Sequence, residues 1–171
     1  MDREQLRAVQ APLKNEYRAN PGAALVTLRA SGRLGEHVTC NVETGRALVQ
    51  AGLHAATGGT GLAACSGDML LQALVACAGV TLSAVATSLG IDVRAGTLHA
   101  EGDLDFRGTL GVAKEAPVGF TRIGLKVDLD SDAAPEALAK LLELTERYCV
   151  VFQTLAQRPA LTVAYGRPGD A

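Results

Sequence analysis

The chain has few aromatic residues and no excess of positive charge. Its 171 residues include three Tyr, three Phe and no Trp, and the formal net charge is −2 at pH 7. Proteins that bind nucleic acid use clustered Lys and Arg to contact the phosphates and aromatic rings to stack the bases. We therefore expect no nucleic acid among the partners of this protein.

Motifs for metal or phosphate binding are also missing. The four Cys and three His residues form no CxxC or HxxxH pair, and no histidine has metal-ligand spacing to a cysteine. Zinc sites usually carry such pairs. The glycine-rich stretch 57–61 (TGGTG) is not followed by the Lys-Ser/Thr of a phosphate-binding loop. We expect no bound cofactor, and we interpret 57–61 as a connector.

The N-terminal residues lack the apolar run of a secretory signal. MDREQLRAVQ is charged where that run would lie, which predicts a cytoplasmic protein. Cytosolic reductants keep thiols reduced, so the four cysteines are expected as free thiols unless they take part in catalysis or sensing. For Cys40, in a predicted strand, and Cys65, just before a predicted helix, the expected role is packing.

Charged residues are absent between Met69 and Leu89. Apolar residues occupy most faces of a helix there, so we expect burial on nearly all sides. Ser66 is the expected N-cap, and Gly90 suits the residue after the C-terminus, where positive φ is common. The length would cross a bilayer, but internal polar residues and the lack of interfacial anchors exclude a membrane span. A helix wrapped by sheet or packed on a partner subunit is predicted.

The remaining pattern predicts one domain with an N-terminal arm. A length of 171 residues with 48% hydrophobic content is sufficient for one core. Residues 1–20 are predicted to form a helical arm that ends at a Pro-Gly turn, and residues 21–171 to form a single domain.

Strands and helices are predicted to segregate rather than alternate. The expected elements are a meander of strands at 24–30, 37–42 and 46–54 with a turn at 32–35, the uncharged helix, strands within 92–106 and 119–130, a helix from Pro135 towards Cys149, a possible further short helix, and a strand at 160–165. The order βββ-α-ββ-α(α)-β indicates the α+β class.

Two segments carry a resemblance to a known family. GDMLLQALVACAGVTL places Cys77 in the uncharged helix, and LLELTERYCVVFQTL places Cys149 after the strand pair. Over residues 23–165 this arrangement resembles the OsmC/Ohr proteins (osmotically inducible protein C and organic hydroperoxide resistance protein). The resemblance implies the OsmC-like fold, with a central buried helix, and an intertwined homodimer with active sites at the subunit interface.

The resemblance also implies a thiol-dependent peroxidase. Cys77 would attack an organic or lipid hydroperoxide, Cys149 would resolve the sulfenic acid as a disulfide, and an external thiol reductant would reopen it. An early arginine, Arg46 or alternatively Arg33, would lower the pKa of Cys77. Because Cys77 lies in the middle of its helix, we expect no help from a helix terminus. An apolar pocket is expected near Met69, Leu70 and Ala73.

The chain departs from the peroxidase pattern at two places. Gly67, followed by Asp68, stands where those relatives have a glutamate, and Val150 replaces the proline that usually follows the second cysteine. These departures place the chain in the broader OsmC-like group. The alternative function is a non-catalytic OsmC-like dimer that binds an apolar small molecule or senses oxidation.

Overall fold

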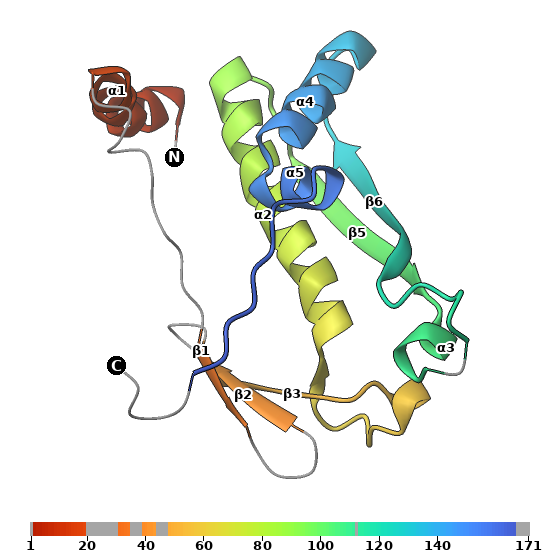
Figure 1. Ribbon diagram of the computed structural model, residues 1–171. Coiled ribbons are helices and arrows are strands. Elements are labelled where there is room, and N and C mark those ends of the chain that lie inside the picture. Colours follow the sequence, from red (N-terminus) through yellow and green to blue (C-terminus); the bar gives the residue numbers. More distant parts are fainter. Residues whose placement is uncertain (1, 20–30, 35–38, 44–47, 112, 167–171) are drawn as a thin grey trace.

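The computed structural model describes residues 2–19, 31–34, 39–43, 48–111 and 113–166 (Figure 1). The chain is a mixed α+β protein. Its helices are α1 (Arg3–Ala19), α2 (Ser66–Leu89), α3 (Phe106–Thr109), α4 (Pro135–Tyr148) and α5 (Val150–Ala156), and its strands are β1 (Ser31–Leu34), β2 (Thr39–Glu43), β3 (Leu48–Gly52), β4 (Ala64–Cys65), β5 (Ala95–Leu104) and β6 (Phe120–Asp130).

The first sheet follows the predicted meander only in part. Its order is β1-β2-β3-β4, antiparallel except for the parallel β3–β4 pair. The predicted second and third strands correspond to β2 and β3. The predicted strand 24–30 lies outside the described residues, and the turn predicted at 32–35 is wrong for residues 32–34, which belong to β1. Strand β1 pairs with β2 from Ser31–Glu43 to Leu34–Cys40. This pairing overrides the preference of Gly32 for a turn.

The second sheet has two long antiparallel strands, β5 and β6, beside α2. Figure 1 shows α2 as the long central helix, with β5 and β6 on one side and α4 and α5 packed against it. Alternate residues of both strands, including Leu98, Ala100, Ile123 and Leu125, pack into the core that α2 shares. The period-2 pattern of the sequence therefore correctly predicted both strands and their apolar faces.

Helix α2 ends at the predicted residue but begins one residue earlier than predicted. Gly90 has φ 72° and its N–H donates to the carbonyls of Ala86 and Thr87, as expected of a C-terminal glycine. The predicted cap by Ser66 is wrong: Cys65 is the N-cap, without a side-chain hydrogen bond, and Ser66 is the first helical residue. The pairing of β4 with β3 holds Cys65 extended, which moves the helix start by one residue.

The burial of α2 is narrower than predicted. Within the single chain, the buried residues are those of one stripe spaced by four: Leu74, Ala78, Leu82 and Ala86. Val80, on another face, is 73% exposed. The expectation of burial on nearly all sides is therefore wrong for the single chain, because β5, α4 and α5 together cover only part of the helix surface.

Helix α2 also has the length and composition of a membrane span. Its mean hydropathy reaches 2.0, and 22% of that window is buried in the chain. Core helices of soluble proteins have the same length and composition, and the buried stripe of α2 packs on β5, α4 and α5 in the manner of a core helix. The packing agrees with the interpretation of α2 as a core element.

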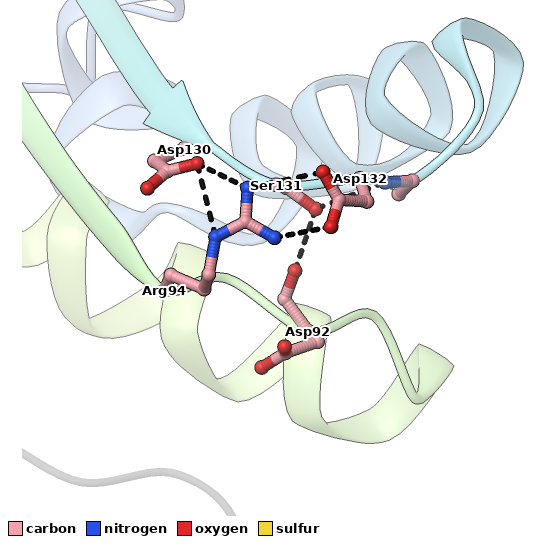
Figure 2. Close-up of polar contacts among 6 residues, drawn as sticks. Asp92, Arg94, Asp130, Ser131 and Asp132 are labelled. Atoms are coloured by element: carbon pink, nitrogen blue, oxygen red, sulfur yellow. Dashed lines mark hydrogen bonds and ion pairs between the residues drawn. The ribbon is translucent and has the colours of Figure 1, made fainter.

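An exposed ion cluster joins the two ends of the β5–β6 hairpin. Arg94, just before β5, pairs with Asp130 at the end of β6 and with Asp132 in the following turn (Figure 2). The Ser131 hydroxyl donates to the carbonyl of Asp92 across the same junction. Exposed pairs of this kind add little stability each. We therefore interpret the cluster as fixing the alignment of β5 with β6 just before α4 begins.

Two terminal segments differ in how they match the prediction. Residues 3–19 form α1, which contacts α2, while the division into an arm at 1–20 and a domain at 21–171 stays a prediction. The strand predicted at 160–165 is wrong: this segment has no regular structure, and Leu161, Val163 and Tyr165 are exposed. Alternating apolar residues give a strand one apolar face. A strand also needs a neighbouring strand for its backbone hydrogen bonds, and the described chain has none beside this segment.

The core predicts a specific loss of stability. Leu141 of α4 is 0% exposed and packs with Leu82 and Ala86 of α2. We expect Leu141→Ala to lower the free energy of unfolding by about 3 kcal/mol, because it removes buried methyl groups and leaves a cavity. Leu110→Ala, at a side chain 55% exposed, should change it by less than about 1 kcal/mol. Urea unfolding followed by circular dichroism measures both; equal losses would contradict this packing.

Candidate active site

The structure brings Cys77 and Cys149 together. Cys77 lies in the middle of α2, and Cys149 is the residue between α4 and α5, with extended backbone angles (φ −74°, ψ 108°). Cys77 packs against the buried cluster that contains Cys149, and neither thiol is in a disulfide. Cys149 is 1% exposed and Cys77 is half-buried, in a cluster with Leu74 and Ala78. Two free thiols in one cluster can form a disulfide when one of them is oxidised.

The first turn of α5 supplies hydrogen bonds to Cys77. The first amides of a helix have no partner within it. Helix α5 packs against α2 (Figure 1), and backbone hydrogen bonding from Val151 and Val150, in the first turn of α5, lowers the pKa of Cys77. The expectation that no helix terminus helps Cys77 is therefore wrong. The terminus belongs to another helix, which position along α2 cannot reveal.

These donors lower the pKa of Cys77. Burial by itself raises the pKa of this thiol, but hydrogen bonds from Val151, Cys149, Val150 and Thr81 outweigh it, so the net direction is downward. A thiolate accepts such bonds more strongly than a neutral thiol does, which is why they favour the charged form. The nucleophilic form of Cys77 is thus more accessible at neutral pH than in an ordinary cysteine.

The pKa of Cys149 moves in the opposite direction. Its burial raises the pKa most, and backbone hydrogen bonding from Phe152 opposes this effect. The neighbouring Cys77 sulfur raises the pKa further, against a smaller opposing contribution from the Val151 backbone. The pKa values of the two thiols therefore shift in opposite directions, downward at Cys77 and upward at Cys149.

The predicted cation is not among the described side chains. Arg46 lies outside the described residues, and Arg33 is placed only by its backbone, in β1. At the start of α2, Gly67 is followed by Asp68, which is exposed in the first turn. Asp68 lines a cavity of about 360 Å³ together with His54 and Cys65, and the pKa of Cys77 has no contribution from it.

An apolar cavity of about 550 Å³ lies next to the thiol pair. It is lined by Leu70 and Leu74 of α2, by residues of β6, and by Phe152 and Leu155 of α5. Leu74 and Phe152 also contact the cluster that holds Cys149 and Cys77. Of the residues expected to line an apolar pocket, Leu70 lines this cavity, whereas Met69 and Ala73 do not.

The other cysteines and histidines form no further centre among the described residues. In that part of the chain no three His, Cys, Asp or Glu side chains are arranged to hold a metal ion. The Nδ1 atom of His54 accepts from the Ala56 amide, and its ring stacks on Phe106 at 4.9 Å between centroids. Cys65 is a half-buried free thiol, and the side chain of Cys40 is outside the description.

Sequence reasoning missed two features of this site. The amides of Val150 and Val151 are backbone groups, which no motif search identifies. Thr81, which makes a small contribution to the lowered pKa of Cys77, was treated only as a polar residue of the uncharged helix. The signal that could have found it was spacing: residues four apart on a helix share a face, so Thr81 lies one turn from Cys77.

Fold and site together define a mixed α+β protein with a thiol pair beside an apolar cavity. The chain belongs to the OsmC-like protein family, whose sequence model matches residues 59–164. This range includes α2, both cysteines and the β5–β6 hairpin. No curated protein sequence matches the chain.

Solved structures support the same fold at low sequence identity. An OsmC-like protein from Mycoplasma pneumoniae is 15% identical with a TM-score of 0.65, over 78% of this chain and 89% of that one. An organic hydroperoxide resistance protein OsmC from Legionella pneumophila is 18% identical (TM-score 0.61, 78% and 91% covered). The organic hydroperoxide resistance protein OhrB of Bacillus subtilis is 18% identical (TM-score 0.52, 78% and 93%).

Proposed function

We propose that this protein is a thiol-dependent peroxidase that reduces organic hydroperoxides. The observation that carries the proposal is the packing of Cys77 against the cluster that holds Cys149, at a place where the backbone at the start of α5 lowers the pKa of Cys77. This arrangement supplies a nucleophile with a lowered pKa and a second thiol in the same cluster. Family relatives described as organic hydroperoxide resistance proteins agree with this class of chemistry.

The first half of the reaction takes place at Cys77. The thiolate attacks the outer oxygen of ROOH, the O–O bond breaks, and the alkoxide leaves and takes a proton to become ROH. The sulfur has lost two electrons and is now a sulfenic acid, Cys77–SOH. The amides of Val150 and Val151 hold the thiolate before attack, so the helix terminus acts on the reactive form of the sulfur.

The second half of the reaction uses Cys149. Its sulfur attacks the Cys77 sulfenic sulfur, the S–O bond breaks, and water leaves with the Cys149 proton, which forms a disulfide. An external dithiol then reduces that disulfide by two exchange steps. No bound cofactor takes part in this scheme, and a reducing cytoplasm is the compartment that would supply the dithiol.

Arg46 is proposed as the cation that supports Cys77, with Arg33 as the alternative. An arginine near the sulfur would favour the thiolate and would stabilise the departing alkoxide. Its contribution would add to the neutral donors already described. Comparing Arg46→Gln with Arg33→Gln tests the assignment, because only the arginine that serves Cys77 should slow the oxidation of that thiol.

The apolar cavity indicates the kind of hydroperoxide. Its walls are mostly aliphatic and aromatic side chains from α2, β6 and α5. Burial of an alkyl group there contributes about 25 cal/mol per Å² of apolar surface, which hydrogen peroxide lacks. We therefore expect alkyl or lipid hydroperoxides to react faster than hydrogen peroxide.

Single-turnover titration tests the proposal. Reduced protein is mixed with cumene hydroperoxide or, separately, hydrogen peroxide, and the loss of free thiols is followed with peptide mass mapping. We expect two thiols lost per chain, a Cys77–Cys149 link, and faster reaction with the organic peroxide. Slow loss without preference for either peroxide would overturn the proposal.

Subunit pairing is part of the same proposal. Val80 of α2 is 73% exposed, and Leu161 and Val163 are 78% and 100% exposed. A second copy of the chain would cover these apolar side chains in an intertwined homodimer. Light scattering should give twice the chain mass of 17.6 kDa. A monomer at micromolar concentration would contradict the pairing.

The second candidate is a non-catalytic dimer that binds an apolar molecule or senses oxidation. Gly67 and Val150, which replace the glutamate and the proline of the peroxidase relatives, favour it. The same titration separates the two functions. A sensor would form the disulfide but would not be recycled through many turnovers, and a binding protein would bind an apolar dye in the 550 Å³ cavity without thiol loss.

A further inference from the structure

A second, smaller cavity has Cys149 in its wall. Its volume is about 160 Å³, and its walls come from α2, β6, α4, α5 and the residue between the last two helices. Leu125 and Phe152 line both this cavity and the larger apolar cavity, so these two side chains separate them. The rest of the wall is formed by Ala78, Val127, Leu142, Thr145, Glu146 and Cys149. We call it the Cys149 cavity.

The Cys149 cavity runs from the core to the surface. Its inner end is formed by the buried residues Ala78, Thr145 and Cys149, whereas Glu146 is exposed and lies where the cavity reaches solvent. A water molecule takes up about 30 Å³, so the cavity has room for the thiol end of a small molecule and not for a peptide chain. Among the described residues that line it, Glu146 is the charged one.

We propose that a small thiol reductant enters the Cys149 cavity to reduce the Cys77–Cys149 disulfide, and that Glu146 at the mouth favours neutral thiols over anionic ones. The inference rests on the proposed function in so far as that function forms the disulfide. Of the two disulfide sulfurs, Cys149 belongs to a residue of the cavity wall, so it is the sulfur that an incoming thiol meets. The hydroperoxide and the reductant thus use separate cavities.

The exchange proceeds with Cys77 as the leaving group. The reductant thiolate bonds to the Cys149 sulfur, the S–S bond breaks, and its electron pair leaves with Cys77 as a thiolate. A second reductant thiolate then attacks the reductant sulfur of the mixed disulfide, and Cys149 leaves and takes a proton. Two reductant thiols are oxidised to a disulfide, and the cysteine pair gains two electrons.

The leaving-group preference agrees with this direction of attack. A thiol with a lower pKa leaves a disulfide faster. The pKa of Cys77 is lowered and that of Cys149 is raised, so departure of Cys77 after attack on Cys149 is the faster of the two exchanges.

The first test follows the reductive step alone. The disulfide is prepared with diamide, without hydroperoxide, and is then mixed with 2-mercaptoethanol. Acid stops the exchange, and peptide masses show which cysteine carries the mixed disulfide. We expect the adduct on Cys149, with Cys77 free. An adduct on Cys77, or no Cys77–Cys149 link after diamide, would overturn the inference.

Narrowing the cavity tests the path of entry. Leu142→Phe adds bulk in the wall, and Leu138→Phe adds the same bulk one turn earlier on α4, outside it. We expect reduction by 2-mercaptoethanol to slow by about fivefold in Leu142→Phe, because exchange depends on access to the attacked sulfur. Leu138→Phe should keep the wild-type rate. Equal rates in the two variants would contradict entry through this cavity.

The charge at the mouth is tested with a matched pair of thiols, neutral 2-mercaptoethanol and anionic 2-mercaptoethanesulfonate. Removing one repelling charge in Glu146→Gln should speed reduction by the anionic thiol about threefold at low salt. High salt should remove this gain, because it screens the charge. The rate with the neutral thiol should not change, and Glu136→Gln, at the other end of α4, should match the wild type. No gain in Glu146→Gln would overturn the role of Glu146, and this variant keeps the inference testable if Leu142→Phe fails to fold.

The outcomes separate the inference from the proposed function. A protein whose diamide-formed disulfide is attacked at Cys149, but which consumes no hydroperoxide, would contradict the proposed function alone. A working peroxidase whose mixed disulfide forms on Cys77 would contradict the inference alone.

Discussion

Cys77→Ser should abolish the reduction of cumene hydroperoxide, with the turnover rate falling by at least about a thousandfold. A serine hydroxyl stays protonated at neutral pH, and the amides of Val150 and Val151 cannot lower its pKa enough to produce an alkoxide. The side chain has almost the same size, so the packing around Leu74 and Ala78 should survive. The measurement is consumption of cumene hydroperoxide with excess dithiol, together with thermal melting.

Cys65→Ser is the matched control for this prediction. Cys65 is also a half-buried free thiol next to α2, but it lines a different cavity, with His54 and Asp68. Its replacement should leave the turnover rate within about a factor of two of the wild type. If Cys77→Ser and Cys65→Ser keep the same activity, the assignment of Cys77 as the nucleophile is wrong.

Cys149→Ser has the second-largest expected effect, and it separates the two halves of the reaction. The first oxidation of Cys77 should proceed, because the backbone of Val150 and Val151 still lowers the pKa of this thiol. Without the second thiol no internal disulfide forms, so the sulfenic acid persists and excess hydroperoxide converts it to sulfinic acid. Steady-state turnover with a dithiol should fall by at least about tenfold.

Trapping identifies the intermediate of this variant. Dimedone added after one equivalent of cumene hydroperoxide should label Cys77 in Cys149→Ser and should label little in the wild type, where the disulfide forms first. Peptide mass after a larger excess should show the sulfinic acid on Cys77. Full turnover in Cys149→Ser, with no dimedone adduct, would mean that Cys149 does not resolve the intermediate.

Much of the fold could be predicted from local pattern. The absence of charge between Met69 and Leu89, with Gly90 after it, predicted α2 to the residue at its C-terminus. Alternation of apolar residues predicted β5 and β6. These signals are local, because the periods of 3.6 and 2 depend only on neighbouring residues. The two conspicuous thiols and their spacing also led to the family.

Errors occurred where a residue depends on a distant partner. β1 at Ser31–Leu34 replaced a predicted turn because β2 pairs with it, and Cys65 became the cap of α2 because β4 pairs with β3. The predicted strand at 160–165 has a strand pattern but no neighbouring edge within the described chain. The stability of a strand depends on its contacts with the partner strand, and the sequence of the strand itself does not show whether that partner is present.

By itself the sequence determined the class, the family and the identity of the two thiols, because these follow from composition, periodicity and motif. Only the tertiary structure decided which sulfur is the better thiolate. The pKa of Cys77 is lowered by backbone amides of α5 and by Thr81, while burial raises the pKa of Cys149. Both effects depend on how α5 packs against α2, and hydrogen bonds act only at contact distance between groups that the chain order keeps far apart.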